Sequence, residues 1–427
     1  MPQTLLLLLA PLLTNSDDWT GWRGPHGDGI ASGSPPIEWS ETKNVRWKAA
    51  LPGGGLSQPI VLAERVFLTC AVGTGKTRMS TPDERNPEPR EIEEQEFSVL
   101  AFERRSGKEL WRKLIGKVMP HEPKHPENTY ATPTPVTDGK LLYVSFGSFG
   151  IHALTPAGEL VWQVDLGDMT NQGHGEGSSP ILYGDSLIVQ WAHWGASYLI
   201  ALDAANGKER WRSPLSEGNN CSTPLVARFG DEDQIVVGGF EVCGIDPRNG
   251  KRLWSFGVGE SRGFTAMASP IVAGELVLIP GMSPRTGFPQ LRAVFVDPES
   301  NSVEELWSLR SDDNIPSPIE HHGRFVYLKG EGGILSLLDS ATGELEYGPE
   351  RLESTPSVWA SPILVGDRLY VVGRDGKTSV LALAPEVTTL AVNELDDHFD
   401  ASPASAGGEL YLRGRTSLYC LAEPSAK

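Results

Sequence analysis

Residues 199–211 read Leu-Ile-Ala-Leu-Asp-Ala-Ala-Asn-Gly-Lys-Glu-Arg-Trp, and this stretch decides the fold because variants of it recur along the chain. Its first four residues form an apolar run that alternates between two faces, which predicts a β-strand. The segment from Asp203 to Gly207 has the composition of a turn, and residues 208–211 predict the start of the next strand. The stretch therefore describes a strand, a turn and a second strand.

Other copies of this stretch place a Trp four residues after a Gly. The pairs are Gly107 and Trp111, Gly158 and Trp162, Gly207 and Trp211, and Gly250 and Trp254. Trp307 continues the series without the Gly, Tyr347 follows Gly343, and Leu390 stands in the seventh copy. A Trp at the start of the fourth strand of each unit gives that unit a large apolar side chain, which we expect to wedge against the neighbouring unit.

A second recurring signal is Ser-Pro or Thr-Pro followed by an apolar run. It occurs at Thr134-Pro135, Ser179-Pro180, Thr223-Pro224, Ser269-Pro270, Ser317-Pro318, Ser361-Pro362 and Ser402-Pro403, with Gln58-Pro59 as a degenerate first copy. The prolines lie 41–48 residues apart, except for a first interval of 76. Proline is tolerated as the first residue of a strand because its missing N–H costs no ladder bond there. A period of about 45 residues with four strands and no helix pattern is typical of a propeller blade.

The repeats predict an all-β protein, an eight-bladed β-propeller of four-stranded antiparallel blades. The eighth copy ends without a Trp strand, whereas residues 45–51 carry Trp47 before the first copy. We therefore expect this N-terminal strand to complete the last blade, which would remove an open sheet edge. A seven-bladed ring, or a different strand assignment, is the alternative.

The chain divides into residues 1–18, which we interpret as a signal peptide, an irregular lead segment over 19–43, the propeller over 44–422 and a tail over 423–427. The apolar run at residues 5–13 is too short to span a bilayer and stands where a signal peptide would, so we expect export to the periplasm or cell surface. Without a preceding Lys or Arg, a misplaced start or a disordered terminus is the alternative. The acidic insertion over 73–97 in the first blade predicts a solvated loop.

The 427-residue chain has a net charge of −18, which argues against nucleic acid or an anionic membrane as partner because both require a basic surface. We expect a monomer without a transmembrane segment. Its cysteines are scattered and predict small buried side chains, with disulfide pairing left open: Cys70, Cys221, Cys243 and Cys420.

The Ser-Pro strand paired with an Ala-Leu-Asp-x-x-x-Gly-x-x-x-Trp strand resembles the PQQ-like β-propeller repeat family, and in particular its BamB-like proteins. The resemblance covers about residues 44–422. It implies one of two functions: quinoprotein dehydrogenases hold pyrroloquinoline quinone and calcium over the axis and oxidise alcohols or sugars, whereas the outer-membrane assembly lipoprotein is a cofactor-free scaffold. This chain lacks the adjacent cysteine pair of many quinoprotein alcohol dehydrogenases, and no calcium-ligand set matches. Its leader also lacks a lipid-accepting Cys.

In a propeller, the segments before each Ser-Pro strand and the loops between second and third strands lie on one face around the axis, where function is expected. The preceding segments contribute Tyr130, His174, Glu176, Asn219, Asn220, Arg262, Asp312, Asp313, Trp359, His398 and Asp400. The loops contribute Trp191, His193, Trp194, Arg285, Lys329, Glu331, Arg374, Arg413 and Arg415.

Three segments on this face suggest binding chemistry. In residues 171–177 the glycines would let the backbone approach a ligand, while His174 and Glu176 offer an acid–base or metal pair. Residues 191–194 would make an aromatic floor for a flat cofactor or sugar, and residues 397–400 would supply carboxylates to a cation. Each also has a plain structural interpretation: a Gly-rich connection, a cap on the blade and a solvated acidic loop.

The sequence therefore predicts an exported propeller that binds a protein, peptide or glycan on its loop-bearing face, with no catalytic residue, metal or cofactor assigned. The alternative is a quinoprotein dehydrogenase that uses pyrroloquinoline quinone with calcium.

Overall fold

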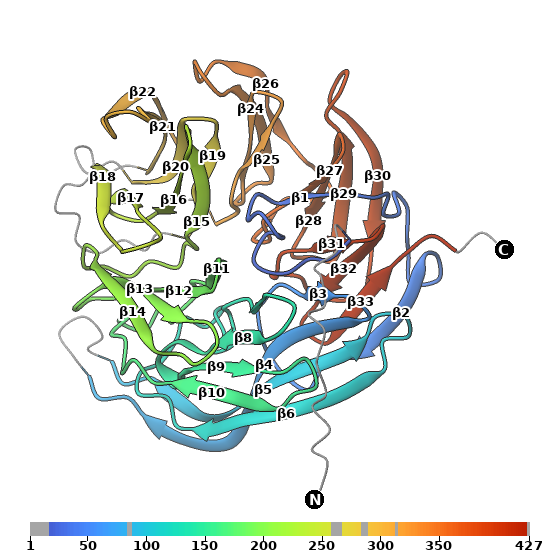
Figure 1. Ribbon diagram of the computed structural model, residues 1–427. Helices are drawn as coiled ribbons and strands as arrows, with labels where there is room; N and C mark the ends of the chain where they lie inside the picture. The colour runs from blue at the N-terminus through green and yellow to red at the C-terminus, as the bar shows by residue number, and fades with distance from the viewer. Residues whose placement is uncertain (1–16, 83–87, 258–266, 283–288, 312–314, 425–427) are drawn as a thin grey trace, which may run out of the picture.

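The computed structural model describes residues 17–82, 88–257, 267–282, 289–311 and 315–424. These residues fold into eight sheets arranged around a central axis, with the first strand of each sheet innermost and the fourth on the rim (Figure 1). Among the described residues there is no α-helix, only the 3₁₀ turn η1 (Gly147–Phe149). The predicted eight-bladed, all-β propeller is confirmed.

In blades one to seven the four strands of the repeat follow the chain from the axis outward. Blades one to four are β3 (Ile60–Leu62), β4 (Arg65–Met79), β5 (Glu91–Glu103) and β6 (Glu109–Val118); β7 (Val136–Thr137), β8 (Leu142–Ser145), β9 (Ile151–Leu154) and β10 (Leu160–Val164); β11 (Ile181–Tyr183), β12 (Ser186–Trp191), β13 (Tyr198–Asp203) and β14 (Glu209–Pro214); and β15 (Leu225–Phe229), β16 (Glu232–Val237), β17 (Val242–Ile245) and β18 (Arg252–Phe256).

Blades five to seven continue the order, and the eighth is completed from the N-terminus. They are β19 (Ile271–Ala273), β20 (Leu276–Met282), β21 (Pro289–Val296) and β22 (Val303–Arg310); β23 (Ile319–His321), β24 (Arg324–Lys329), β25 (Ile334–Asp339) and β26 (Leu345–Arg351); β27 (Ile363–Val365), β28 (Arg368–Val372), β29 (Lys377–Ala382) and β30 (Thr388–Glu394); and β31 (Ala404–Ala406), β32 (Glu409–Arg413), β33 (Ser417–Leu421) and β2 (Val45–Ala50).

Strand β2 closes the ring as predicted. It pairs antiparallel with β33, with Trp47 opposite Cys420. The Trp47 side chain is buried, and its indole N–H donates to the Arg104 carbonyl of blade one at 2.8 Å. The two ends of the propeller are thereby joined through one strand, and β33 is not left as an unpaired edge.

The recurring tryptophans join neighbouring blades as expected. The Trp162 indole, for example, donates to the Ala204 carbonyl of the next blade at 2.9 Å. Gly207 lies against the same ring: its φ is +73°, and a Cβ there would stand 2.7 Å from the Trp162 ring. The repeat therefore requires Gly at this position both for the left-handed backbone and for the close approach of Trp.

The Ser and Thr of the Ser-Pro signal form a ring of hydrogen bonds around the axis. In the series Gln58, Thr134, Ser179, Thr223, Ser269, Ser317, Ser361 and Ser402, the backbone N–H of each residue up to Ser361 donates to the hydroxyl of the next residue at 2.9–3.0 Å. The Gln58 side chain reaches the Pro403 carbonyl and completes the circle. All of these groups are buried. The hydroxyls thus satisfy inner backbone groups that would otherwise be buried without a partner.

The lead segment, which the sequence predicts to be irregular, fills one end of the axis. Trp19 bridges Val61 of β3, and β1 (Ile30–Ala31) adds in parallel to β27. Between them, the buried Arg23 guanidinium donates to the Pro318 carbonyl at 2.6 Å. Asp18 accepts a hydrogen bond from the Ala63 N–H in the turn between β3 and β4, which places this plug at the turn end of the inner strands.

The acidic insertion is not the solvated loop that its composition predicts. Strands β4 and β5 continue into it as an antiparallel ribbon, with Thr77 opposite Glu93. The Arg78 guanidinium donates to the Pro120 and His121 carbonyls, so the ribbon packs against the segment that precedes blade two. Side chains alternate along the ribbon, so Ile92 is buried while charged side chains face water. Composition alone does not reveal this alternation.

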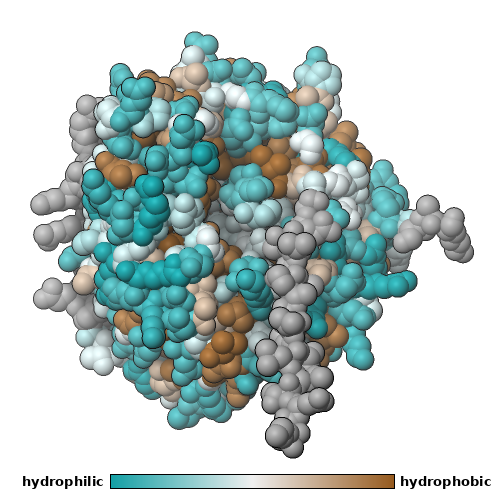
Figure 2. All heavy atoms as spheres, viewed as in Figure 1, coloured by the Kyte–Doolittle hydropathy of each residue, from teal (hydrophilic) through white to brown (hydrophobic). Residues whose placement is uncertain are grey.

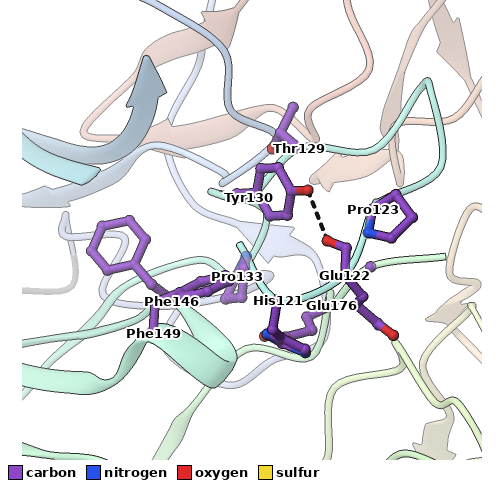
Figure 3. Close-up of a pocket in the computed structure, with 10 residues that line it drawn as sticks. His121, Glu122, Pro123, Thr129, Tyr130, Pro133, Phe146, Phe149 and Glu176 are labelled. Atoms are coloured by element: carbon purple, nitrogen blue, oxygen red, sulfur yellow. Dashed lines mark hydrogen bonds between the residues drawn. The ribbon is translucent and has the colours of Figure 1, made fainter. Parts of the chain in front are cut away.

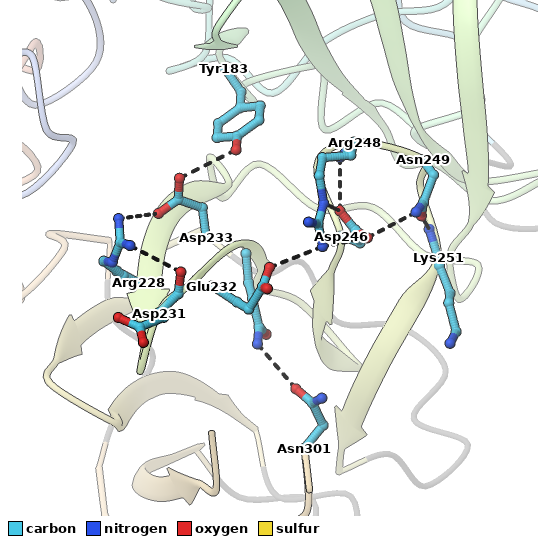
Figure 4. A network of polar contacts seen from close by, with 11 residues as sticks. Tyr183, Arg228, Asp231, Glu232, Asp233, Asp246, Arg248, Asn249, Lys251 and Asn301 are labelled. Atoms are coloured by element: carbon cyan, nitrogen blue, oxygen red, sulfur yellow. Dashed lines mark hydrogen bonds and ion pairs between the residues drawn. The ribbon is translucent and has the colours of Figure 1, made fainter. Parts of the chain in front are cut away.

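The hydrophobic core lies between the blades, and polar contacts cross the same boundaries. Blades three and four meet through Tyr183, whose hydroxyl donates to Asp233, and blades four and five meet through Gln234 and Asn301 (Figure 4). Hydrophilic side chains cover most of the face in Figure 2, with hydrophobic ones in smaller patches between them. In the described ranges no helix is long and apolar enough to cross a membrane.

Candidate functional site

A pocket of about 470 Å³ opens along the propeller axis. Its base includes hydroxyl-bearing residues of the Ser/Thr ring, and the plug contributes Trp22. Its walls come from the segments that precede the inner strands. It is lined by Trp22, Leu56, His125, Glu127, Asn128, Thr132, His174, Gly177, Ser179, Cys221, Thr223, Met267, Ile315, Trp359, Ser361, Asp400 and Ser402. The plug lies at the opposite end of the inner strands, so the pocket is on the loop-bearing side of the axis.

An ion-pair cluster forms one wall of this axial pocket. The Arg374 guanidinium lies 3.8 Å from the centre of the Trp359 ring and donates to Asp400 at 2.6 Å and to Glu127 at 2.9 Å. Asp400 is almost fully buried, at 2% side-chain exposure, and also meets His398 at 3.0 Å. These contacts bring residues from three separate blade connections and one loop to a single point, as expected for the loop-bearing face.

The predicted aromatic floor does not form. Trp191 is the last residue of β12 and lies buried beside Leu187 and Val189, with its ring stacked on Tyr198 at 6.3 Å. His193 is also buried and accepts a hydrogen bond from the Thr170 N–H, while Trp194 packs near Phe240. Strand alternation simply continues to Trp191, so its ring faces the core and is not available to a ligand.

His174 and Glu176 do not form the predicted pair, because they face different spaces. His174 lines the axial pocket, and its ring contacts the Asn171 carbonyl at 3.2 Å. Glu176 turns toward η1, where it accepts hydrogen bonds from the Ser148 N–H and hydroxyl. Glu176 and Tyr130 both line a second, small cavity (Figure 3), and the Tyr130 hydroxyl donates to the Glu122 carbonyl at 3.0 Å. Only Gly175, with a φ of +83°, separates the two residues, yet their side chains enter different spaces, which separates the proposed acid from the proposed base.

The remaining predicted residues are buried in structural roles, lie toward the surface or fall outside the described ranges. Glu331 and Arg415 are exposed and Lys329 is half-buried. Asn220 donates to the Gly238 carbonyl and accepts from the Ser222 N–H, so it holds its own connection, and Asn219 is buried beside it. Arg413 is buried between blades eight and one, where it donates to the Ser57 and Thr69 carbonyls. The residues outside the described ranges are Arg262, Arg285, Asp312 and Asp313.

Several pocket residues were not predicted from the sequence. Trp22 comes from the lead segment, Met267 and Ile315 precede inner strands, and His125 follows the ribbon contact. The density of tryptophans in residues 19–22 was a usable signal, because an irregular segment that carries two large apolar rings must bury them somewhere. The pocket cysteine, Cys221, has a thiol whose pKa burial raises to about 12, so it stays protonated.

Residues 95–346, more than half of the chain, match the family described as outer membrane protein assembly factor BamB. This chain belongs to the BamB family. A search of curated proteins finds no match. Among solved structures, BamB from Moraxella catarrhalis is similar with a TM-score of 0.54 and 11% identity, covering 83% of this chain and 99% of that one.

Two dehydrogenases of known structure share the architecture of this BamB-family chain. A europium-containing methanol dehydrogenase has a TM-score of 0.59 and 10% identity, covering 95% of this chain and 91% of its own. The quinohemoprotein alcohol dehydrogenase of Comamonas testosteroni has a TM-score of 0.58 and 10% identity, covering 97% and 82%. At these identities the similarity extends to the fold alone.

The pocket of this BamB-family protein is a poor fit for a quinone held by calcium. Calcium requires several free oxygen ligands, and a flat quinone requires an uncovered aromatic face. Among the described lining residues, the carboxylates of Glu127 and Asp400 both accept from Arg374, and the same guanidinium covers the Trp359 ring. A cation would have to displace Arg374 before it could bind there.

Glu176 should make the stability of the protein depend on pH. Burial raises the pKa of its carboxyl from the usual 4.5 to about 8, although the two hydrogen bonds from Ser148 act to lower this pKa. The unfolded chain therefore releases a proton above pH 4.5 that the folded chain retains until about pH 8. The free energy of unfolding should fall across that window by about 1–4 kcal/mol.

In the Glu176→Gln variant this fall should be absent, because the amide does not titrate. Urea unfolding at pH 5 and pH 8 measures the difference, with Glu299→Gln on the exposed turn after β21 as the matched control. A wild-type protein that is equally stable at both values, or an E176Q variant with the same fall, would contradict the assignment.

Proposed function

We propose that this BamB-family protein is an exported, monomeric binding scaffold that takes a protein, peptide or glycan ligand into the axial pocket and performs no catalysis there. The observation on which this rests is the pocket itself, about 470 Å³ in volume and open on the loop-bearing face. That volume lies within the range of ordinary ligand sites and accommodates a few side chains or one to two sugar rings.

The lining suits an uncharged or weakly charged ligand. Apolar contacts come from Leu56, Met267 and Ile315, and hydroxyl and amide groups from Thr132 and Asn128. The ionised side chains at the wall are already paired with one another, so they orient a ligand through remaining hydrogen-bonding capacity and do not form new ion pairs. With the net charge of −18, this chemistry disfavours nucleic acid as the partner.

Export is part of the proposal. It is supported by the apolar run at residues 5–13 and by the name of the family, which refers to assembly at the outer membrane. Fractionation of cells that produce the full chain tests it: recovery outside the cytoplasm agrees with export, and retention in the cytoplasm contradicts it.

Binding is tested with the full chain and a variant whose pocket mouth is filled. Met267→Trp adds a bulky ring at the pocket, and Leu306→Trp adds the same ring to the exposed outer strand β22 of the same blade as a matched control. Phage-displayed random peptides and an oligosaccharide array serve as probes. We expect selected ligands to lose at least tenfold in affinity for M267W and to keep their affinity for L306W.

The quinone alternative is tested on the same preparations. Pyrroloquinoline quinone with calcium is added at micromolar concentration, and cofactor absorbance and dye reduction are followed. We expect no stoichiometric binding. Tight binding with dye reduction would replace the scaffold by a dehydrogenase, and ligands that bind M267W as well as wild type would move the binding surface away from the axis.

A further inference from the structure

Two consecutive histidines stand at a position where the other blades carry different residues. The turn between the first and second strands has Gly184, Gly230, Gly274, Gly366 and Gly407 at its tip in five blades, with φ between +55° and +60°. Blade six has His322 there, with φ +52°. A left-handed backbone is strained for a residue that carries a β-carbon, so His322 occupies this turn at a conformational cost, as Ala63 does in blade one with φ +50°.

The residue before it departs from the repeat as well. The last residue of β23 is His321, at a position that other blades fill with apolar residues such as Val365 and Ala406. The rings of His321 and His322 lie with centroids 4.2 Å apart. The His321 Nε2 faces the Asp367 carboxylate at 2.9 Å, and Asp367 belongs to the corresponding turn of blade seven.

We propose that His321, His322 and Asp367 form a binding site for a divalent transition-metal ion of the Zn²⁺ class, which bridges blades six and seven. One ligand atom of each residue lies within 4.8 Å of the others. With metal–ligand bonds of about 2.0–2.1 Å, tetrahedral ligand atoms stand roughly 3.3 Å apart, so small side-chain rotations bring the three onto one ion. Two imidazoles and one carboxylate favour Zn²⁺, Co²⁺ or Ni²⁺ over Mg²⁺ or Ca²⁺, which prefer oxygen ligands.

The site is accessible and partly preorganised. His321 is buried, at 7% side-chain exposure, whereas Asp367 is 52% exposed and His322 is also exposed. Solvent can therefore supply the ion and occupy the remaining coordination position. This turn end of the inner strands is the end away from the axial pocket, so the proposal is independent of the proposed scaffold function.

The test uses the untagged full chain, stripped with a chelator and titrated with Zn²⁺ against a competing indicator. The decisive variant is His322→Gly, which gives blade six the turn glycine of the other blades and should leave the apoprotein at least as stable as wild type. Asp367→Asn removes the charged ligand. We expect one equivalent of Zn²⁺ on the wild type, at least tenfold weaker binding to H322G and D367N, and a Zn²⁺-dependent rise in melting temperature for the wild type alone.

Cobalt substitution identifies the ligands. Co²⁺ in the proposed site gives weak visible bands and no thiolate charge-transfer band, whereas a site built from the four cysteines would show that band. Absence of stoichiometric binding, a thiolate band, or an H322G variant that binds as tightly as wild type would overturn the proposal and leave the His321–Asp367 contact as a simple hydrogen bond between blades.

Discussion

Replacing Trp47 by Ala should destabilise the protein by about 3–5 kcal/mol, the range for removing a buried Trp from a packed core. The side chain is 7% exposed, and its ring lies 6.0 Å from Tyr411 in its own blade and against Gly107 of blade one. Its loss leaves a cavity at the boundary where the two ends of the chain meet. The chain runs directly from β2 of blade eight into β3 of blade one, so the ring is closed within blade eight, by the β2–β33 ladder and by the side-chain contacts around Trp47.

A Trp47→Phe variant separates packing from hydrogen bonding. Phe keeps most of the ring contact but removes the N–H that donates to the Arg104 carbonyl, so we expect a loss of about 1 kcal/mol. Urea unfolding followed by circular dichroism measures both variants without relying on tryptophan fluorescence. If W47A unfolds at the wild-type urea concentration, β2 is not what closes the ring.

The repeat made the fold predictable, because blade number, closure and the tryptophan contacts all follow from features that recur. The Ser/Thr ring was missed for a physical reason. The sequence shows Ser179 next to Pro180, which explains the proline by strand geometry, but the partner of the Ser179 hydroxyl is the Thr134 N–H, 45 residues earlier. Only the spatial period of the blades makes those two groups neighbours.

The site was less predictable, because it depends on where non-repeating side chains point. Trp191 was misassigned although the alternation Leu187, Val189, Trp191 already placed it on the inner face. The loop at residues 397–400 was expected either to be solvated or to hold a cation. Asp400 is instead buried against Arg374 of the neighbouring blade, a contact that no local pattern specifies.

Replacing Asp400 by Asn should cost about 3 kcal/mol, because it leaves the Arg374 guanidinium without its nearest anion. Breaking a buried ion pair typically costs 3–5 kcal/mol, and the low end applies here since Arg374 keeps Glu127 and the face of Trp359. The Asp400 side chain is only 2% exposed, so water cannot replace the lost interaction with Arg374. The loss should persist in 1 M salt, which screens surface pairs but not buried ones.

A double-mutant cycle shows whether the pair itself is responsible. Arg374→Met removes the cation while keeping an apolar side chain over Trp359, and we expect D400N/R374M to be at least 1 kcal/mol more stable than the sum of the single losses predicts. Urea unfolding of the four proteins measures the coupling, and Asp375→Asn, on the exposed part of the same loop, is the matched control. If the losses of stability in the two single variants simply add, Asp400 acts through its backbone connection. The wall of the axial pocket would then not depend on this ion pair.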